Sequence, residues 1–192
     1  MHSGGGRIGG RDSPRRSGWT TGALAALGLA SACGTPGSSS TDSGDEPFYA
    51  FASDFHGYHS WKSFDVTGGA ALAGIHDGST VTEYVKRLPP HGSTTFPVGT
   101  IIIKEATGGT DPHELFAMVK RGGGYNPGAP GWEWFDLQQL TDGTDSVQII
   151  WQGFTPPAGD TYGGSTTAGC NTCHTDCGND AVCAKPLQLS NF

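Results

Sequence analysis

The chain has 192 residues, and its 18 acidic and 11 basic side chains give a formal net charge of −7 at pH 7. This acidic balance argues against binding to nucleic acid and against electrostatic binding to anionic lipid. With 32 Gly, 12 Pro and few Leu, the composition favours strands and turns over a bundle of helices.

The first 33 residues have the features of an export signal. Residues 1–18 carry four Arg against one acidic residue, and an apolar stretch of about 12 residues follows. That stretch is too short to span a bilayer permanently. Ala30, Ser31 and Ala32 precede Cys33, which predicts a lipobox with Cys33 as the lipidated first residue. Ordinary signal cleavage is the alternative. Either would export the protein to the periplasm or outer surface of a bacterium, and in the first case the lipid anchor would be its only membrane attachment.

The segment at 34–46 holds no large apolar residue and is predicted to be a disordered tether. Residues 47–192 have the length of one domain. Cleavage would remove four basic residues and one acidic residue, so the mature charge would be −10.

Within this domain the predicted elements are mainly strands. Residues 48–64, rich in aromatic residues and His, are the first candidate helix. Strands are predicted at 79–87, 96–106, 132–137 and 147–151. Residues 113–121 fit a helix or a strand, and the Gly run at 122–124 favours a strand in a hairpin. A short helical turn is predicted at 176–182. These elements predict an α+β fold, mostly an antiparallel sheet with flanking helices.

The motif Cys170-Asn171-Thr172-Cys173-His174 is the attachment pattern of a c-type haem. Its two thiols form thioethers with the porphyrin vinyl groups, and its imidazole becomes the proximal iron ligand. The motif therefore predicts one covalent haem c near the C-terminus. Such haem is attached outside the cytoplasm, which agrees with the predicted export.

Two further cysteines follow the motif. In an oxidising compartment Cys177 and Cys183 are expected to form a disulfide. The alternative is a four-thiolate zinc site built from Cys170, Cys173 and these two. Possible sixth ligands to iron are His56, His59, His76, His91 and His113, but nothing in their spacing selects one.

Most of the mature domain resembles the cytochrome P-460 family, which includes the non-catalytic beta-type cytochromes c-prime. The resemblance is carried by 82–85 (TEYV), 96–105 (FPVGTIIIKE), 118–121 (MVKR), 131–135 (GWEWF), and the haem motif followed by Asp180 and Val182. It implies a small antiparallel-sheet domain, usually a homodimer. Catalytic members oxidise hydroxylamine and carry a lysine covalently bonded to the porphyrin. The resemblance places Lys104 at that position.

The residues around Lys104 support the same interpretation. In a strand, Lys104 shares a face with Ile102, and it follows three consecutive Ile. If it faced a haem, desolvation would leave a neutral amine able to attack the macrocycle. The alternative is that Lys104 ends the strand and reaches to water.

One position departs from the catalytic pattern. Phe116 stands where catalytic members carry a distal carboxylate, and Glu114, two residues earlier, could substitute for it. Two functions therefore remain. One is hydroxylamine oxidation, with electrons passing to a soluble redox partner. The other is a gas-binding or electron-transfer cytochrome without turnover, in which Phe116 guards the iron against ligands larger than a diatomic gas.

Overall fold

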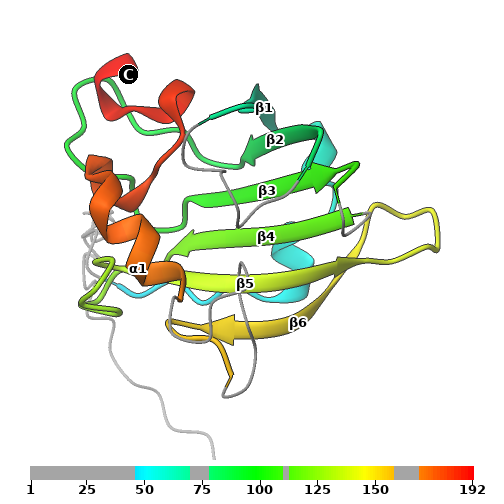
Figure 1. The fold of residues 1–192 in the computed structure, drawn as a ribbon. Coiled ribbons are helices and arrows are strands. Elements are labelled where there is room, and N and C mark those ends of the chain that lie inside the picture. The colour runs from blue at the N-terminus through cyan, green and yellow to red at the C-terminus, as the bar shows by residue number, and fades with distance from the viewer. Residues whose placement is uncertain (1–45, 70–77, 110–112, 158–168) are drawn as a thin grey trace, which may run out of the picture. The chain divides into compact units, whose positions relative to one another are not determined.

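A six-stranded antiparallel sheet forms the framework of the computed structural model, which describes residues 46–69, 78–109, 113–157 and 169–192 (Figure 1). The predicted export signal with Cys33, and the tether except Glu46, lie outside the described residues.

The strands follow chain order across the sheet, and each is antiparallel to its neighbour. They are β1 (Lys62–Asp65), β2 (Thr80–Val85), β3 (Ile101–Thr107), β4 (His113–Lys120), β5 (Trp132–Gln139) and β6 (Val147–Gly153). The strands predicted from the sequence are confirmed as β2 to β6, and the ambiguous segment at 113–121 pairs with β3 as the second strand of a hairpin.

The predicted α+β class with flanking helices is wrong. Among the described residues the one α-helix is α1 (Cys170–His174), five residues long. The candidate helix at 48–64 forms instead two short 3₁₀ turns, η1 (Ala52–Phe55) and η2 (Tyr58–Ser60), followed by β1. Gly57 lies between the turns with φ +67°, a left-handed conformation that interrupts a helix. Its aromatic neighbours Phe55 and Tyr58 are fully buried. These side chains therefore pack against the sheet although they belong to short turns and not to a helix.

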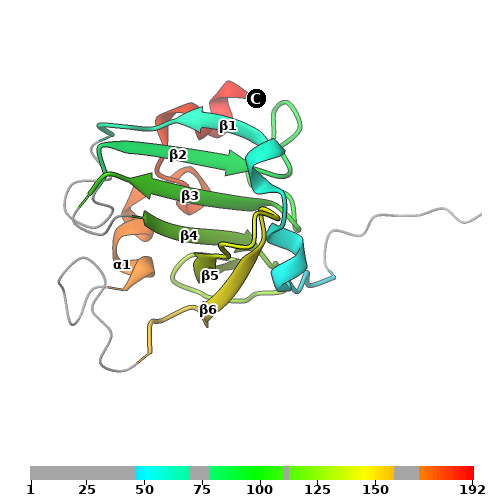
Figure 2. The ribbon, with the colours of Figure 1, turned by 90° about the vertical axis from the view of Figure 1, so that its right-hand side faces the viewer.

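The sheet buries apolar side chains on both faces, because successive side chains along each strand point to opposite faces and apolar residues occupy both. One face includes Val81, Val85, Ile102, Ala106, Met118, Trp132 and Trp134. The other includes Ile101, Ile103, Leu115, Ala117, Val119, Phe135 and Leu137, and it packs against Phe55 and Tyr58. Cys170 of α1 packs against the first of these clusters, and in Figure 2 α1 and the cyan turns η1 and η2 lie at opposite sides of the strands. We call the face that includes Ile102, Met118 and Trp134 the α1 face.

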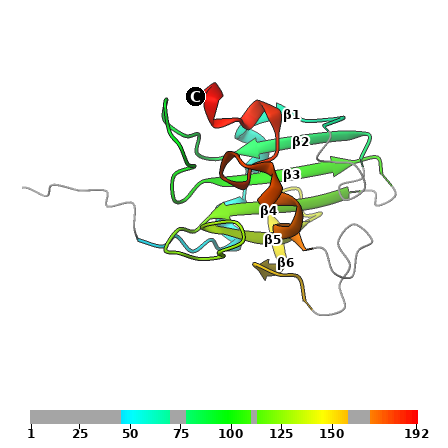
Figure 3. The same cartoon turned by 60° about the vertical axis from the view of Figure 1, so that its left-hand side comes forward.

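After α1 the chain continues over the α1 face in short 3₁₀ turns (Figure 3). These are η4 (Thr175–Cys177), η5 (Asn179–Ala181), η6 (Lys185–Leu187) and η7 (Leu189–Asn191). Val182 and Leu187 are buried in the same cluster as Trp132, so the C-terminal segment adds apolar cover that a sheet face needs. No helix within the described ranges combines the length and apolarity that crossing a bilayer requires.

Candidate functional site

The helix α1 carries both cysteines and the histidine of the C-x-x-C-H motif. Cys170 and Cys173 are three positions apart, so their thiols emerge on the same side of the helix, and His174 follows one turn after Cys170. Cys170 is partly buried against the apolar cluster of the α1 face, whereas Cys173 is exposed, and neither belongs to a disulfide. Burial raises the pKa of the Cys170 thiol to about 11. The motif thus presents two thiols and an imidazole at one edge of the α1 face.

The imidazole of His174 has a defined orientation. Its Nδ1 lies 2.8 Å from the carbonyl oxygen of Ala181, and its ring packs on Trp134 with the ring centroids 4.5 Å apart. Because a carbonyl oxygen can only accept, a hydrogen bond here requires the proton on Nδ1, which leaves the ring lone pair on Nε2. Histidines that ligate metals commonly have this arrangement, with one nitrogen fixed by the protein and the other directed at the metal.

Asn171, between the two cysteines, anchors α1 to the domain. Its side-chain amide exchanges two hydrogen bonds with that of Asn126, of 2.9 and 2.6 Å, and its oxygen accepts a third from the Trp134 indole at 2.8 Å. Asn126 is buried and also donates to the Trp132 carbonyl at 2.8 Å. A five-residue helix is too short to be stable alone, so these bonds hold the motif in its helical form.

The structure joins Cys177 to Cys183 by a disulfide, the pairing expected from the sequence. That bond takes two of the four thiolates that the zinc alternative requires. Among the described residues, no group of three or more His, Cys, Asp or Glu side chains is arranged to hold a metal ion.

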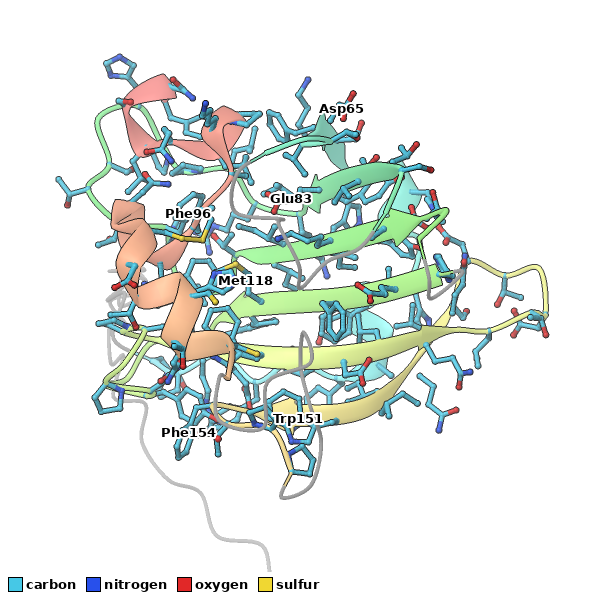
Figure 4. All side chains as sticks on the ribbon, viewed as in Figure 1. Asp65, Glu83, Phe96, Met118, Trp151 and Phe154 are labelled. Atoms are coloured by element: carbon cyan, nitrogen blue, oxygen red, sulfur yellow. A yellow bond between two sulfur atoms is a disulfide. The ribbon has the colours of Figure 1, made fainter. Side chains whose placement is uncertain are left out.

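Beside α1, one row of side chains crosses the sheet. The strand register pairs Glu83 with Lys104, Lys104 with Phe116, Phe116 with Asp136, and Asp136 with Trp151. This row lies on the α1 face. Trp151 packs against the cluster of that face. Phe116 and Asp136 are each two residues from a member of the cluster, Met118 and Trp134 respectively, and residues two apart on a strand share a face. Figure 4 labels Glu83, Met118 and Trp151, which come from three strands of this face. We call the five residues the Lys104 row.

Lys104 has an ionic partner at one end of the row. Its Nζ lies 3.5 Å from Oε1 of Glu83, and both side chains are largely buried. Burial raises the pKa of Glu83, and the Lys104 charge opposes that rise without cancelling it. The other oxygen, Oε2, is buried and has no hydrogen-bond partner in the described part of the chain. The sequence placed Lys104 on this face but did not reveal Glu83 as its partner.

Phe116 and two carboxylates lie further along. Phe116 is half-buried between Lys104 and Asp136 on the neighbouring strands. Glu114 points to the same face two residues earlier, opposite Ala106. The structure therefore brings the predicted Glu114, Phe116 and Lys104 together. It adds Asp136, whose position on the face of Trp132 and Trp134 was readable from strand alternation alone.

The histidines considered as sixth ligands are not gathered at this face. His59 and His113 contact Glu105 on the opposite face, at 3.4 and 2.9 Å. His56 and His91 are exposed, and His76 lies outside the described residues.

The residues of the α1 face fit a haem c. Two thiols outside any disulfide stand beside an imidazole whose Nδ1–H is bonded, as thioether attachment and axial ligation require. The adjoining Lys104 row offers half-buried aromatic side chains at Phe116 and Trp151 for a porphyrin plane. The buried, unsatisfied Oε2 of Glu83 marks a polar position in the same row.

Comparison of the chain with family models, curated proteins and solved structures found no match in any of the three.

Proposed function

We propose that the chain is an exported c-type haem protein of the cytochrome P-460 type that oxidises hydroxylamine. One observation carries the proposal: α1, with its oriented His174, packs on the sheet face that presents Lys104 and Asp136 in one row. The ligand set and the residues for proton transfer thus belong to one side of one sheet.

In this proposal Cys170 and Cys173 hold a single haem c through thioethers, and His174 ligates the iron through Nε2. When bound, haem c supplies a redox-active iron that accepts the electrons of the substrate and passes them to a soluble redox partner. Oxidation of an N–H and O–H substrate also releases protons. The carboxylates of Asp136 and Glu114, on the same face, are the groups that would accept them.

Lys104 and Glu83 act together in the proposal. If Lys104 is bonded to a porphyrin carbon, as the family resemblance implies, its amine and that carbon would each lose a proton, and an external two-electron oxidant would take up the electron pair. Glu83 is the nearby base, with Oε1 at 3.5 Å. Because burial raises the pKa of Glu83, its carboxyl group holds a proton more readily than an exposed glutamate does.

Lipidation at Cys33 would anchor the protein outside the cytoplasm, and the tether would let the domain reach its redox partner. Assembly as a homodimer is part of the same proposal, through the family resemblance.

Phe116 favours a second candidate function. An aromatic ring at the centre of the Lys104 row would make an apolar site suited to a diatomic gas such as NO. In that case the protein would bind gas or carry electrons, Lys104 would stay unattached to the ring, and no substrate would turn over.

One set of measurements on the holoprotein from a host that exports and matures c-type cytochromes separates the two. Oxidation of hydroxylamine, a strongly red-shifted Soret band and a haem peptide joined to Lys104 support the enzyme. An ordinary c-type spectrum with NO binding and no turnover supports the second candidate. The Phe116→Glu variant introduces the distal carboxylate of the catalytic family members. It should gain hydroxylamine oxidation only if the rest of the site is arranged for that reaction.

A further inference from the structure

The loop that follows α1 has an unusual backbone. Asn179, Asp180 and Ala181 have φ angles of +45°, +54° and +65°, so three consecutive residues other than glycine adopt the left-handed conformation. Residues with a Cβ rarely enter this region, and consecutive ones do so only when the surroundings impose it. The carbonyl of Ala181, the third of them, is the one that contacts Nδ1 of His174 at 2.8 Å.

Asp180, at the centre of this loop, is held from three directions. Its Oδ1 pairs with Nζ of Lys120 at 2.6 Å, and its Oδ2 accepts the backbone N–H of Phe96 at 2.8 Å. Its carbonyl oxygen accepts the indole N–H of Trp132 at 2.6 Å. The two charged side chains of the pair are only 9% and 7% exposed, so the interaction is weakly screened by solvent.

The ends of the loop are secured by other groups. The disulfide joins Cys177 to Cys183, and the side chain of Asn179 donates to the carbonyls of Val182 and Leu187 at 2.9 and 3.0 Å. Attachment of the loop to the domain therefore does not depend on Asp180 alone. What Asp180 specifically fixes is the backbone at its own position, including its carbonyl, and the Ala181 carbonyl belongs to the next peptide group along the chain.

We propose that Asp180 and Lys120 are positioning residues for His174. Their ion pair holds the left-handed loop so that the Ala181 carbonyl accepts from Nδ1, and this sets the tautomer of the ring and its strength as a ligand. The inference rests on the proposed function, because it assigns His174 as the iron ligand. A stronger hydrogen bond from Nδ1 makes an imidazole a better electron donor, which favours the oxidised metal and lowers its reduction potential.

The variant Asp180→Asn tests the proposal, since it preserves shape and removes the charge that pairs with Lys120. Lys120→Met breaks the same pair from the other side. Glu133→Gln is the matched control, because it breaks the Arg121–Glu133 ion pair of 3.2 Å, whose acid is also buried but lies on the opposite face of the sheet.

Three readouts follow the hydrogen bond itself. In the full-length chain without haem, the ¹⁵N shifts of the His174 ring report which nitrogen carries the proton. In the holoprotein, the iron–histidine stretching frequency of the ferrous state and the midpoint potential of the ferric/ferrous couple report ligand strength. We expect the wild type and Glu133→Gln to be protonated on Nδ1. For Asp180→Asn and Lys120→Met we expect a population protonated on Nε2, a lower stretching frequency and a higher potential.

A wild-type ring protonated on Nε2 would overturn the proposal, whether or not the variants fold. So would pair-breaking variants whose ring shifts, stretching frequency and potential match those of Glu133→Gln. A chain that never acquires haem would refute the proposed function, but the ring tautomer would still decide whether the pair positions His174.

Discussion

At the scale of single residues, the chemistry of Lys104 is set by side chains from neighbouring strands. Glu83 on β2 lies on one side of it and Phe116 on β4 on the other. Next to Phe116, Asp136 supplies a carboxylate from β5. On the α1 face, the neighbours of Lys104 along its own strand are Ile102 and Ala106, so its proton-accepting neighbour on that face comes from across the sheet.

Replacement of Asp136 tests whether it accepts substrate protons. Removal of a general base typically slows a reaction by about 10²- to 10⁴-fold, so we expect Asp136→Asn to lower kcat for hydroxylamine by at least about 10²-fold and to change the pH profile of the rate. Steady-state kinetics on the haem-loaded protein measure this. Asp65→Asn, which alters an exposed carboxylate on β1, should leave the rate unchanged. Equal rates for both variants would exclude Asp136 as the base.

On the opposite face, Glu105 links folding stability to pH. Its carboxylate accepts hydrogen bonds from Tyr58 and Tyr84 at 3.0 and 3.1 Å. Burial acts to raise its pKa, but hydrogen bonds from His113 and Tyr58 and the charge of His59 outweigh burial and lower it.

A carboxyl group whose pKa is lower in the folded state stabilises the fold above its unfolded pKa, and that contribution disappears as pH falls through the folded value. We therefore expect the unfolding free energy of the wild type to decline as the pH falls below 4.5, the ordinary pKa of a glutamate. Glu105→Gln should decline less steeply. Urea unfolding at a series of acidic pH values measures both curves, and parallel curves would show that Glu105 does not contribute.

At the scale of elements, the C-terminal segment depends on cross-links because its helix and turns are short. The disulfide between Cys177 and Cys183 closes a small loop of sequence separation 6. The loop-closure model gives such a bond about 2 kcal/mol of stability.

The double variant Cys177→Ser and Cys183→Ser should accordingly lower the unfolding free energy by about 2 kcal/mol, as measured by urea denaturation. Thiol reductant should lower the stability of the wild type by a similar amount and leave the double variant unaffected. Sensitivity of the double variant to reductant would show that other sulfur chemistry, at Cys170 and Cys173, controls stability.

The strands were predictable because their signal is local. The three Ile before Lys104 and the alternation around Trp134 identify β3 and β5 without tertiary information. The helix predicted at 48–64 failed because aromatic residues that pack on a sheet from turns resemble those that form an amphipathic helix, and Gly57 decides between the two.

The candidate site was predictable only in part, because some of its contacts are local in the chain and others depend on tertiary structure. The thiols and the imidazole are adjacent in the chain, so a motif reveals them. The ion pair of Lys104 with Glu83 depends on strand register. The bond from His174 to Ala181 depends on a left-handed loop, for which Ala carries no sequence signal.

At the scale of the whole molecule, the proposed function makes net charge relevant to encounters with a redox partner. Without residues 1–33 the net charge is −10, so a basic redox partner would be attracted at long range. We expect electron transfer to a basic soluble cytochrome to slow as ionic strength rises, and transfer to an acidic one to quicken. Stopped-flow kinetics over a range of salt concentrations measure both. A rate to the basic partner that does not change with salt would show that charge does not guide the encounter.

The central claim is that α1 carries a covalently attached haem, and the mass of the peptide that contains Cys170 and Cys173 tests it most directly. The full-length chain and a Cys170→Ala, Cys173→Ala variant would be produced in a host that exports and matures c-type cytochromes. The account predicts that the wild-type peptide carries the mass of one haem and the variant peptide none. A colourless wild-type protein, with those two sulfurs free or joined to each other, would contradict it.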